Sequence, residues 1–130
     1  MSRAKNQMSL QQMRAEAKRT QVRKLKRRIL EAGLPEPEEE VRFHAWRRWR
    51  YDLSYTKHKI AIEYEGGTWS GKSRHTSPKG YRNDAEKYTE GAILGWLVVR
   101  ITADMLRDGM AVDMVRRALE ARGAIEKEVG

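Results

Sequence analysis

The stretch from Trp49 to Trp69, WRYDLSYTKHKIAIEYEGGTW, constrains the possible fold more than any other part of the chain. Two runs of alternating side-chain character flank a short polar connection, and two glycines follow the second run. This pattern is typical of a β-hairpin closed by a turn. A two-residue loop at Lys57 and His58 sets four cross-strand pairs, namely Tyr55 with Ile60, Leu53 with Ile62, Tyr51 with Tyr64 and Asp52 with Glu63.

The predicted register divides the hairpin between two faces, because successive side chains of a strand point in opposite directions. One face is apolar and carries Tyr51, Leu53, Tyr55, Ile60, Ile62 and Tyr64. The other face carries Arg50, Asp52, Ser54, Ala61, Glu63 and Glu65. Three carboxylates are therefore expected to converge on one small patch.

Asp52 opposite Glu63 sets like charges against each other, which is unfavourable without a positive charge nearby. A divalent cation would supply that charge, and proteins bind Mg²⁺ through one or two carboxylates together with water and phosphate oxygens. The alternative is a solvated charged face on which Arg50 neutralises Glu65. The hairpin pattern alone leaves both interpretations open.

Composition limits the kinds of protein and site to consider. The length of 130 residues suits one domain with an arm. The chain has no cysteine and only three scattered histidines, which excludes disulfides and thiolate zinc sites and favours an oxygen-bound metal. No apolar run approaches the length of a membrane span and the N-terminus lacks a signal-peptide pattern, so we expect a soluble cytoplasmic protein, in a bacterial host if phage-encoded.

The net charge of +9 is concentrated at one end of the chain. Residues 1 to 30 hold ten lysines or arginines and one acid, so of 27 basic and 18 acidic residues in all, 17 of each remain in residues 31 to 130. The first segment is therefore a cationic arm on a neutral body. An arm of this kind favours a polyanionic partner.

The cationic arm reads as a helix over residues 9 to 32, with a capping box at Ser9 and Gln12 and an end at Gly33 and Pro35. Its apolar positions change face, which predicts a break or fraying near Thr20. We expect disorder before about residue 8, and docking of the second half on the domain through Val22, Leu25 and Ile29. Arg23, Lys26, Arg27 and Arg28 are expected to stay in solvent. Together with Lys24 they are predicted to contact nucleic acid, or else to form a solubilising face.

Residues 34 to 40, LPEPEEE, read as a stiff acidic connector, in which Glu39 or Glu40 is either solvated or an additional ligand of the carboxylate patch. A first strand is predicted over 41 to 46, with Arg47 and Arg48 in the following turn. Trp46 and Trp49 beside these arginines are typical of a nucleic-acid stacking platform or, alternatively, of aromatic packing around a turn.

Two further helices and a strand are predicted in the second half. Residues 66 to 80 form a long loop whose Lys72, Arg74, His75 and Lys79 would meet a phosphate near the carboxylates. A helix over 80 to 94 is expected to pack through Tyr81, Ala85, Tyr88 and Ala92, with Asp84 and Lys87 either facing the site or paired with each other. Residues 96 to 101 read as a strand buried on both faces. A final helix over 108 to 123 turns Met110, Met114, Val115, Ala118 and Leu119 inward.

These elements predict an α/β fold in which a central mixed sheet of about four strands is flanked by helices. We divide the chain into a basic helical arm, residues 1 to 33, and an α/β domain, residues 34 to 130.

This order, together with WRYDLSY, KIAIEYEGGTW, RHTSPKGYRNDAEKY and GWLVVRIT, resembles the PD-(D/E)XK nuclease superfamily. The likeness is greatest to the small phage and bacterial endonucleases related to the VRR-NUC and very-short-patch-repair (Vsr-like) groups. It implies a restriction-endonuclease-like core with Asp52 and Glu63 as metal ligands. Glu65 stands where the superfamily has a lysine. The basic residue is then Lys79 or Lys87, or Glu65 is itself a metal ligand.

The resemblance implies a Mg²⁺-dependent endonuclease that hydrolyses DNA phosphodiester bonds, with Mn²⁺ able to substitute and with structure-specific or nicking activity among the alternatives. A homodimer would be the simplest way to cut both strands. The alternatives are a non-catalytic nucleic-acid-binding protein with a degenerate nuclease fold, and an adaptor for an acidic partner.

Overall fold

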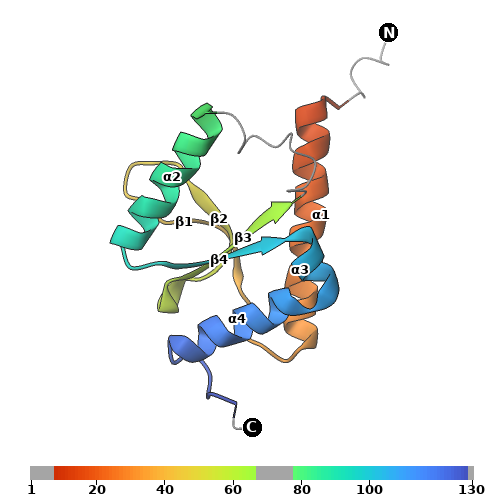
Figure 1. Cartoon of the computed structure of the whole chain (residues 1–130), viewed down its shortest axis with the longest axis vertical. Helices are drawn as coiled ribbons and strands as arrows, with labels where there is room; N and C mark the ends of the chain where they lie inside the picture. Colours follow the sequence, from red (N-terminus) through yellow and green to blue (C-terminus); the bar gives the residue numbers. More distant parts are fainter. Residues whose placement is uncertain (1–7, 67–77, 129–130) are drawn as a thin grey trace.

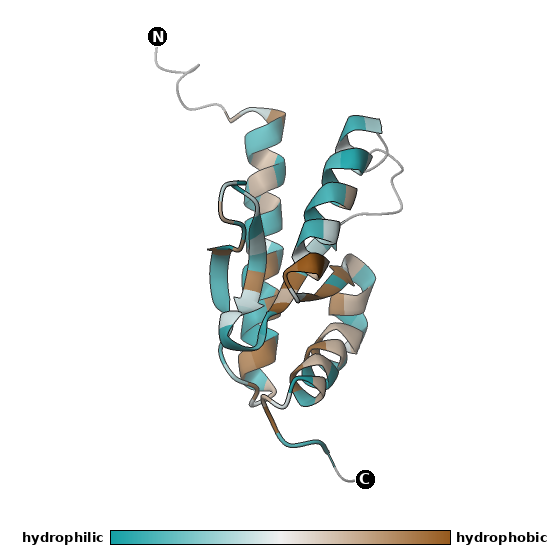
Figure 2. Ribbon diagram, turned by 90° about the vertical axis from the view of Figure 1, so that its left-hand side faces the viewer, coloured by the Kyte–Doolittle hydropathy of each residue, from teal (hydrophilic) through white to brown (hydrophobic). Residues whose placement is uncertain are grey.

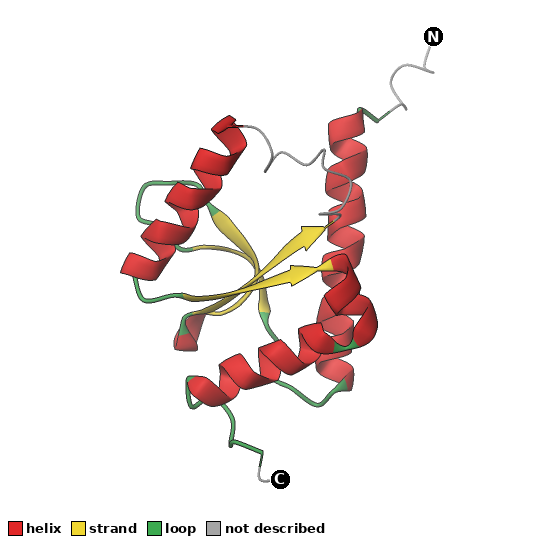
Figure 3. Cartoon of the chain, viewed as in Figure 1, coloured by secondary structure: helices red, strands yellow, loops and turns green. Residues whose placement is uncertain are grey.

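The computed structural model describes residues 8 to 66 and 78 to 128. It contains a four-stranded sheet between helices, as Figures 1 and 3 show. The elements in chain order are α1 (Leu10–Glu31), β1 (Glu38–Arg42), β2 (Arg50–Tyr55), the 3₁₀-helix η2 (Thr56–His58), β3 (Ile60–Gly66), α2 (Pro78–Ile93), β4 (Leu97–Thr102), α3 (Ala103–Asp108) and α4 (Met110–Ala121).

The sheet is mixed, with the order β1-β2-β3-β4. Strand β2 is antiparallel to both β1 and β3, and β4 lies parallel to β3 after the crossover through α2. This arrangement confirms the predicted α/β class. The strand β4 was expected to be buried on both faces, but most of its residues are half-buried, and among the described strands it lies at the edge of the sheet and pairs with β3 alone.

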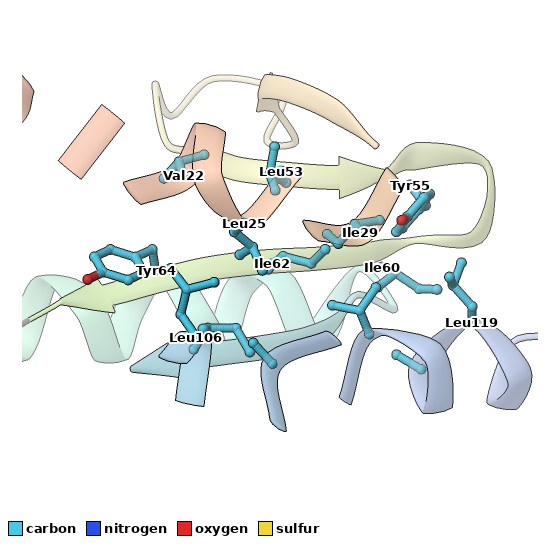
Figure 4. Close-up of a cluster of buried hydrophobic side chains, with 14 residues drawn as sticks. Val22, Leu25, Ile29, Leu53, Tyr55, Ile60, Ile62, Tyr64, Leu106 and Leu119 are labelled. Atoms are coloured by element: carbon cyan, nitrogen blue, oxygen red, sulfur yellow. The ribbon is translucent and has the colours of Figure 1, made fainter. Parts of the chain in front are cut away.

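Helix α2 covers one face of the sheet, and α1, α3 and α4 cover the other (Figures 1 and 2). The main core lies on the second face, where α1 contributes Val22, Leu25 and Ile29 to a cluster with the apolar side chains of β2 and β3 (Figure 4). The predicted docking of this helix is confirmed. Because these three residues belong to the core of the domain, the second half of α1 is packed as part of it, and the predicted boundary at residue 33 stays a prediction.

The capping box at Ser9 is confirmed, since its side chain accepts from the backbone of Gln12, whose side chain accepts in return from Ser9. The predicted break near Thr20 is wrong. The helix is continuous, and the Thr20 hydroxyl donates to the Glu16 carbonyl one turn earlier. The change of apolar face instead marks where α1 leaves the core, because nearly every residue from 8 to 20 is exposed. The predicted disorder before residue 8 lies outside the described residues.

The strand predicted over 41 to 46 begins earlier, because β1 takes in Glu38, Glu39 and Glu40, and residues 43 to 49 form the connection to β2. The packing face of α2 also differs from the prediction. Its buried residues are Asp84, Lys87 and Gly91, whereas Tyr81 is exposed. Ala85 and Ala92 are exposed as well. Lys87 packs inward because it pairs with Glu63 and the Arg50 carbonyl of the sheet beneath it.

Helix α4 buries Val115, Ala118 and Leu119 as predicted. Met114 is half-buried and Met110 is exposed, so the prediction for Met110 is wrong. The short helix α3 and the turn at Gly109, which has a φ of +88°, rotate the start of α4 so that Ala111 is buried instead. Within residues 8 to 66 and 78 to 128, no helix combines the length and apolar character needed to cross a membrane.

The predicted register holds for two pairs, Leu53 opposite Ile62 and Tyr55 opposite Ile60. The ladder ends at Leu53, so the other two predicted pairs, Asp52 with Glu63 and Tyr51 with Tyr64, do not form in it. The two-residue loop is wrong: residues 56 to 59 make the connection through η2, and Lys59 takes a left-handed conformation with a φ of +53°. The single apolar face is also wrong. Tyr51 packs on the α2 side with Ala61 and Trp96. The ladder between β2 and β3 ends at Leu53, and twist of β2 beyond this point directs the Tyr51 side chain to the opposite face.

Candidate active site

Asp52 and Glu63 interlock at the point where β2 and β3 separate. The backbone N–H of Asp52 donates to Glu63 Oε1 at 3.2 Å, and the backbone N–H of Tyr64 donates to Asp52 Oδ2 at 2.8 Å. Each carboxylate therefore satisfies a backbone group of the opposite strand that the sheet leaves without a ladder partner. The reciprocal bonds fix both carboxylates side by side.

Lys87 reaches the same point from α2. Its Nζ lies 3.2 Å from Glu63 Oε1 and donates to the carbonyl of Arg50 at 2.8 Å. Lys87 is 8% exposed and Glu63 is 4% exposed, so this is a buried ion pair. The prediction that Lys87 faces the site is confirmed. The other candidate lysine, Lys79, lies exposed in the first turn of α2, about two turns away from Lys87.

Burial and the charge of Asp52 raise the pKa of Glu63 to about 7, against the opposing effects of Lys87 and Lys18. Removal of water from the carboxylate is the largest cause. The two lysines therefore do not fully offset the cost of burying the Glu63 carboxylate. A further positive charge beside Glu63 would favour its ionised form.

The second lysine, Lys18, comes from α1 and was not among the predicted site residues. Its Nζ lies 3.3 Å from Asp52 Oδ1. Sequence spacing contains the signal, since Lys18 precedes the buried Val22 by four residues and so lies on the docking face of the helix. A cleft of about 280 Å³ opens at this contact and is lined by Ala15, Lys18, Arg19, Val22, Arg23, Glu39, Glu40 and Asp52.

Glu39 and Glu40 line the cleft but have other partners. Glu39 Oε2 accepts from Lys26 at 2.9 Å, and Glu40 Oε2 lies 3.9 Å from Arg50 Nη1. Both glutamates therefore lie near Asp52 while they pair with cations outside the interlocked carboxylates.

Glu65 pairs with strand β4. Its Oε1 lies 2.5 Å from Arg100 Nε and 3.4 Å from the Tyr88 hydroxyl, and its side chain is largely buried. The alternative pairing of Glu65 with Arg50 is wrong, because Arg100 takes that place. Among residues 8 to 66 and 78 to 128, no three acidic or histidine side chains are grouped to hold one metal ion. The three-carboxylate patch thus reduces to the pair Asp52 and Glu63.

The predicted nucleic-acid contacts on α1 divide into two kinds. Arg23 and Arg27 are exposed, as predicted, and Lys24 is half-buried. Lys26 and Arg28 are not left in solvent: Lys26 pairs with Glu36 and Glu39, and Arg28 donates to the carbonyl of Leu106 at 3.2 Å. These two side chains fasten α1 to the body because they lie beside its buried stripe.

The two tryptophans near the loop between β1 and β2 differ in environment. Trp49 packs near Phe43 with Arg47 stacked over its ring at 3.9 Å, and Arg47 pairs with Glu86 at 2.8 Å. Trp46 is 80% exposed, and Arg48 is exposed beside it. Packing therefore accounts for Trp49 but not for Trp46. The predicted contacts Lys72, Arg74 and His75 lie outside the described residues.

Comparison with known proteins gives relatives without an assigned role. Two uncharacterized proteins of Mycobacterium tuberculosis, one from strain CDC 1551 / Oshkosh and one from strain ATCC 25618 / H37Rv, are each 30% identical to this chain over 81 residues. The match covers 61% of this chain and 28% of each relative, so the chain spans under a third of their length. No protein-family model and no solved structure matches the chain significantly.

Proposed function

We propose that this chain is a divalent-metal-dependent endonuclease that hydrolyses DNA phosphodiester bonds. The observation that carries the proposal is the interlocked pair Asp52 and Glu63, with the buried Lys87 against Glu63. The order of elements, one helix and three antiparallel strands followed by a crossover helix and a parallel strand, matches the order that the superfamily resemblance implies.

The carboxylates of Asp52 and Glu63 suit a hard divalent cation, because they are adjacent and donate oxygen ligands. Mg²⁺ bound there would lower the pKa of a water molecule and neutralise charge on a phosphate. The chain itself orients these carboxylates: Tyr64 N–H holds Asp52, and Lys87 holds Glu63. Lys87 is therefore our candidate for the basic residue of the superfamily pattern.

The cationic side chains near the pair suit a nucleic-acid backbone. Lys18 contacts Asp52, and the exposed Arg23 lines the same cleft. Basic side chains that face phosphates give affinity with little sequence information. This arrangement supports a substrate that lies along α1 and passes over Asp52.

The test compares Asp52→Asn and Glu63→Gln with Glu40→Gln, a matched control from the same cleft. We expect both site variants to lose Mg²⁺-dependent cutting of supercoiled, linear or branched DNA and Glu40→Gln to keep it. An RNA panel run in parallel tests the choice of substrate, and thermal unfolding of each variant checks that the fold survives. Cutting that persists in either site variant would falsify the proposed site.

One observation favours a second candidate, a nucleic-acid-binding protein without catalytic activity. Each carboxylate of the pair has a lysine partner within the chain, Lys18 for Asp52 and Lys87 for Glu63. These ion pairs let the fold exist without a cation. In this case Asp52→Asn would leave DNA binding intact and the wild-type protein would bind no Mn²⁺, whereas the endonuclease proposal requires Mn²⁺ binding that Asp52→Asn abolishes.

A further inference from the structure

The two lysines at the carboxylate pair are held in different ways. Lys87 is buried and tied to both Glu63 and the Arg50 carbonyl. Lys18 has a side chain that is 40% exposed, and Asp52 is its ion-pair partner among the described residues. The Asp52 side chain is 14% exposed, so solvent competes mainly for the lysine end of this pair, and the Tyr64 N–H stays on Asp52 when the lysine leaves. Lys18 can therefore leave Asp52 at lower cost than the buried Lys87 can leave Glu63.

The position of Lys18 places it in competition with any cation at the site. Its ammonium group lies against Asp52 Oδ1, one of the two oxygens that the carboxylate offers to a metal. The other oxygen, Oδ2, already accepts from Tyr64 N–H. Two positive charges at one carboxylate oxygen repel each other, so binding of a divalent ion at Asp52 displaces Lys18.

The cleft beside Asp52 gives the displaced ammonium group somewhere to go. Lys18 and Arg23 line the cleft from α1. The four-carbon stem of lysine lets its ammonium group move within this space without any movement of the helix. A phosphate in the cleft would be the natural anionic partner for the freed group.

We propose that Lys18 exchanges partners: it neutralises Asp52 in the metal-free protein and contacts a substrate phosphate once a divalent cation has bound at Asp52. This inference rests on the proposed function. Lys18 is then a positioning residue that couples metal binding to nucleic-acid binding. Such coupling is reciprocal, so the nucleic acid also strengthens metal binding.

The first experiment measures Mn²⁺ binding by titration calorimetry on the whole chain without DNA. Lys18→Met removes the competing charge and should tighten Mn²⁺ binding roughly tenfold, the order expected for a unit charge a few ångströms from a divalent ion in a solvent-accessible site. Lys18→Arg retains the charge and should bind Mn²⁺ as the wild-type protein does. Arg23→Met, the control from the same cleft, should change the affinity little. Asp52→Asn should abolish binding.

The second experiment measures duplex DNA binding against salt concentration, once in EDTA and once with Ca²⁺ in place of Mg²⁺. Lys18 gains a phosphate contact only after it has left Asp52, so the ion should steepen the wild-type salt dependence by about one unit. In Lys18→Met the slopes with and without the ion should agree. This readout does not depend on cleavage.

Two results would overturn the inference. If Lys18→Met binds Mn²⁺ no more tightly than wild type, while Asp52→Asn abolishes both binding and cutting, Lys18 does not compete with the metal and the proposed endonuclease stands. If neither the wild-type protein nor Lys18→Met binds Mn²⁺, the inference and the proposed function both fail. Thermal unfolding of Lys18→Met and Lys18→Arg verifies that the compared proteins are folded.

Discussion

The contact between α2 and β2 predicts that one substitution will reverse its effect on stability when a second site changes. A methyl group added at Gly91 would lie 2.3 Å from the Tyr51 hydroxyl oxygen, well inside contact distance, but at an ordinary 3.6 Å from the ring carbon that carries it. The tyrosine cannot move aside, because its fully buried ring stacks on Phe43 at 4.1 Å and lies against Trp96. The hydroxyl is therefore the source of the conflict.

The expected magnitudes follow from that geometry. Gly91→Ala gains about 1 kcal/mol of helix propensity and loses about 3 kcal/mol to overpacking, so in the wild-type background it should destabilise the protein by about 2 kcal/mol. Tyr51→Phe removes a hydroxyl that has no hydrogen-bond partner among the described residues, so it should be neutral or stabilising. In the Tyr51→Phe background, Gly91→Ala should stabilise by about 1 kcal/mol. The coupling between the two sites is then about 3 kcal/mol.

The assay is a double-mutant cycle measured by urea unfolding and circular dichroism. Tyr55→Phe serves as the control, because its hydroxyl donates to the Pro35 carbonyl at 2.7 Å and its loss should cost about 1 kcal/mol. The reasoning is refuted if Gly91→Ala has the same effect in both backgrounds, or if Tyr51→Phe costs as much as Tyr55→Phe.

Three other predictions concern the site and its surroundings. Folding raises the pKa of Glu63 from 4.5 to about 7, so the folded protein binds a proton there more tightly than the unfolded chain. This proton's contribution to the free energy of unfolding is fully present below pH 4.5 and is lost as the pH rises through 7. In EDTA, wild type should lose stability relative to Glu63→Gln between pH 5 and pH 8, measured by urea titration; parallel curves contradict this. Lys26→Gln should lower stability by up to about 1 kcal/mol through its pairs with Glu36 and Glu39. Arg23→Gln should weaken DNA binding with no loss of stability. If Lys26→Gln and Arg23→Gln change stability equally, the distinction between a fastening lysine and an exposed arginine is refuted. Trp46→Ala should leave the unfolding midpoint unchanged and weaken single-stranded DNA binding by about 1 kcal/mol or more; unaltered binding would exclude stacking.

Alternation and helix periodicity predicted the parts of the fold in which apolar side chains decide the packing. The pairs Leu53 with Ile62 and Tyr55 with Ile60 were predictable because a shift of one residue would turn all of these apolar side chains to the opposite face of the sheet. The docking of α1 through Leu25 followed from helix periodicity, which places Val22, Leu25 and Ile29 on one face. Side-chain spacing left two alternatives for Lys87, a pair with Asp84 or a position facing the site, and the structure shows it against Glu63.

The missed features are those in which polar contacts or chain geometry decide. The inward stripe of α2 has no apolar period, because its buried residues include Asp84 and Lys87, and Lys87 pairs with Glu63 on the sheet. The turn of Tyr51 to the α2 face depends on where β2 and β3 separate, which no local pattern encodes. Lys18 was not predicted, because a lysine in a basic helix resembles the many solvated charges around it. Its spacing from Val22 places it on the docking face, but the path of α1 in the fold is what brings it to Asp52.

The acidic edge strand β1 has a consequence for self-association. An exposed edge invites pairing with a strand of another molecule. Three successive glutamates, Glu38 to Glu40, stand on this edge, and Glu40 has a φ of +56°, which interrupts the regular extended backbone. A strand brought against β1 would meet a distorted ladder at Glu40. This geometry disfavours pairing along this edge, and the homodimer stays a prediction.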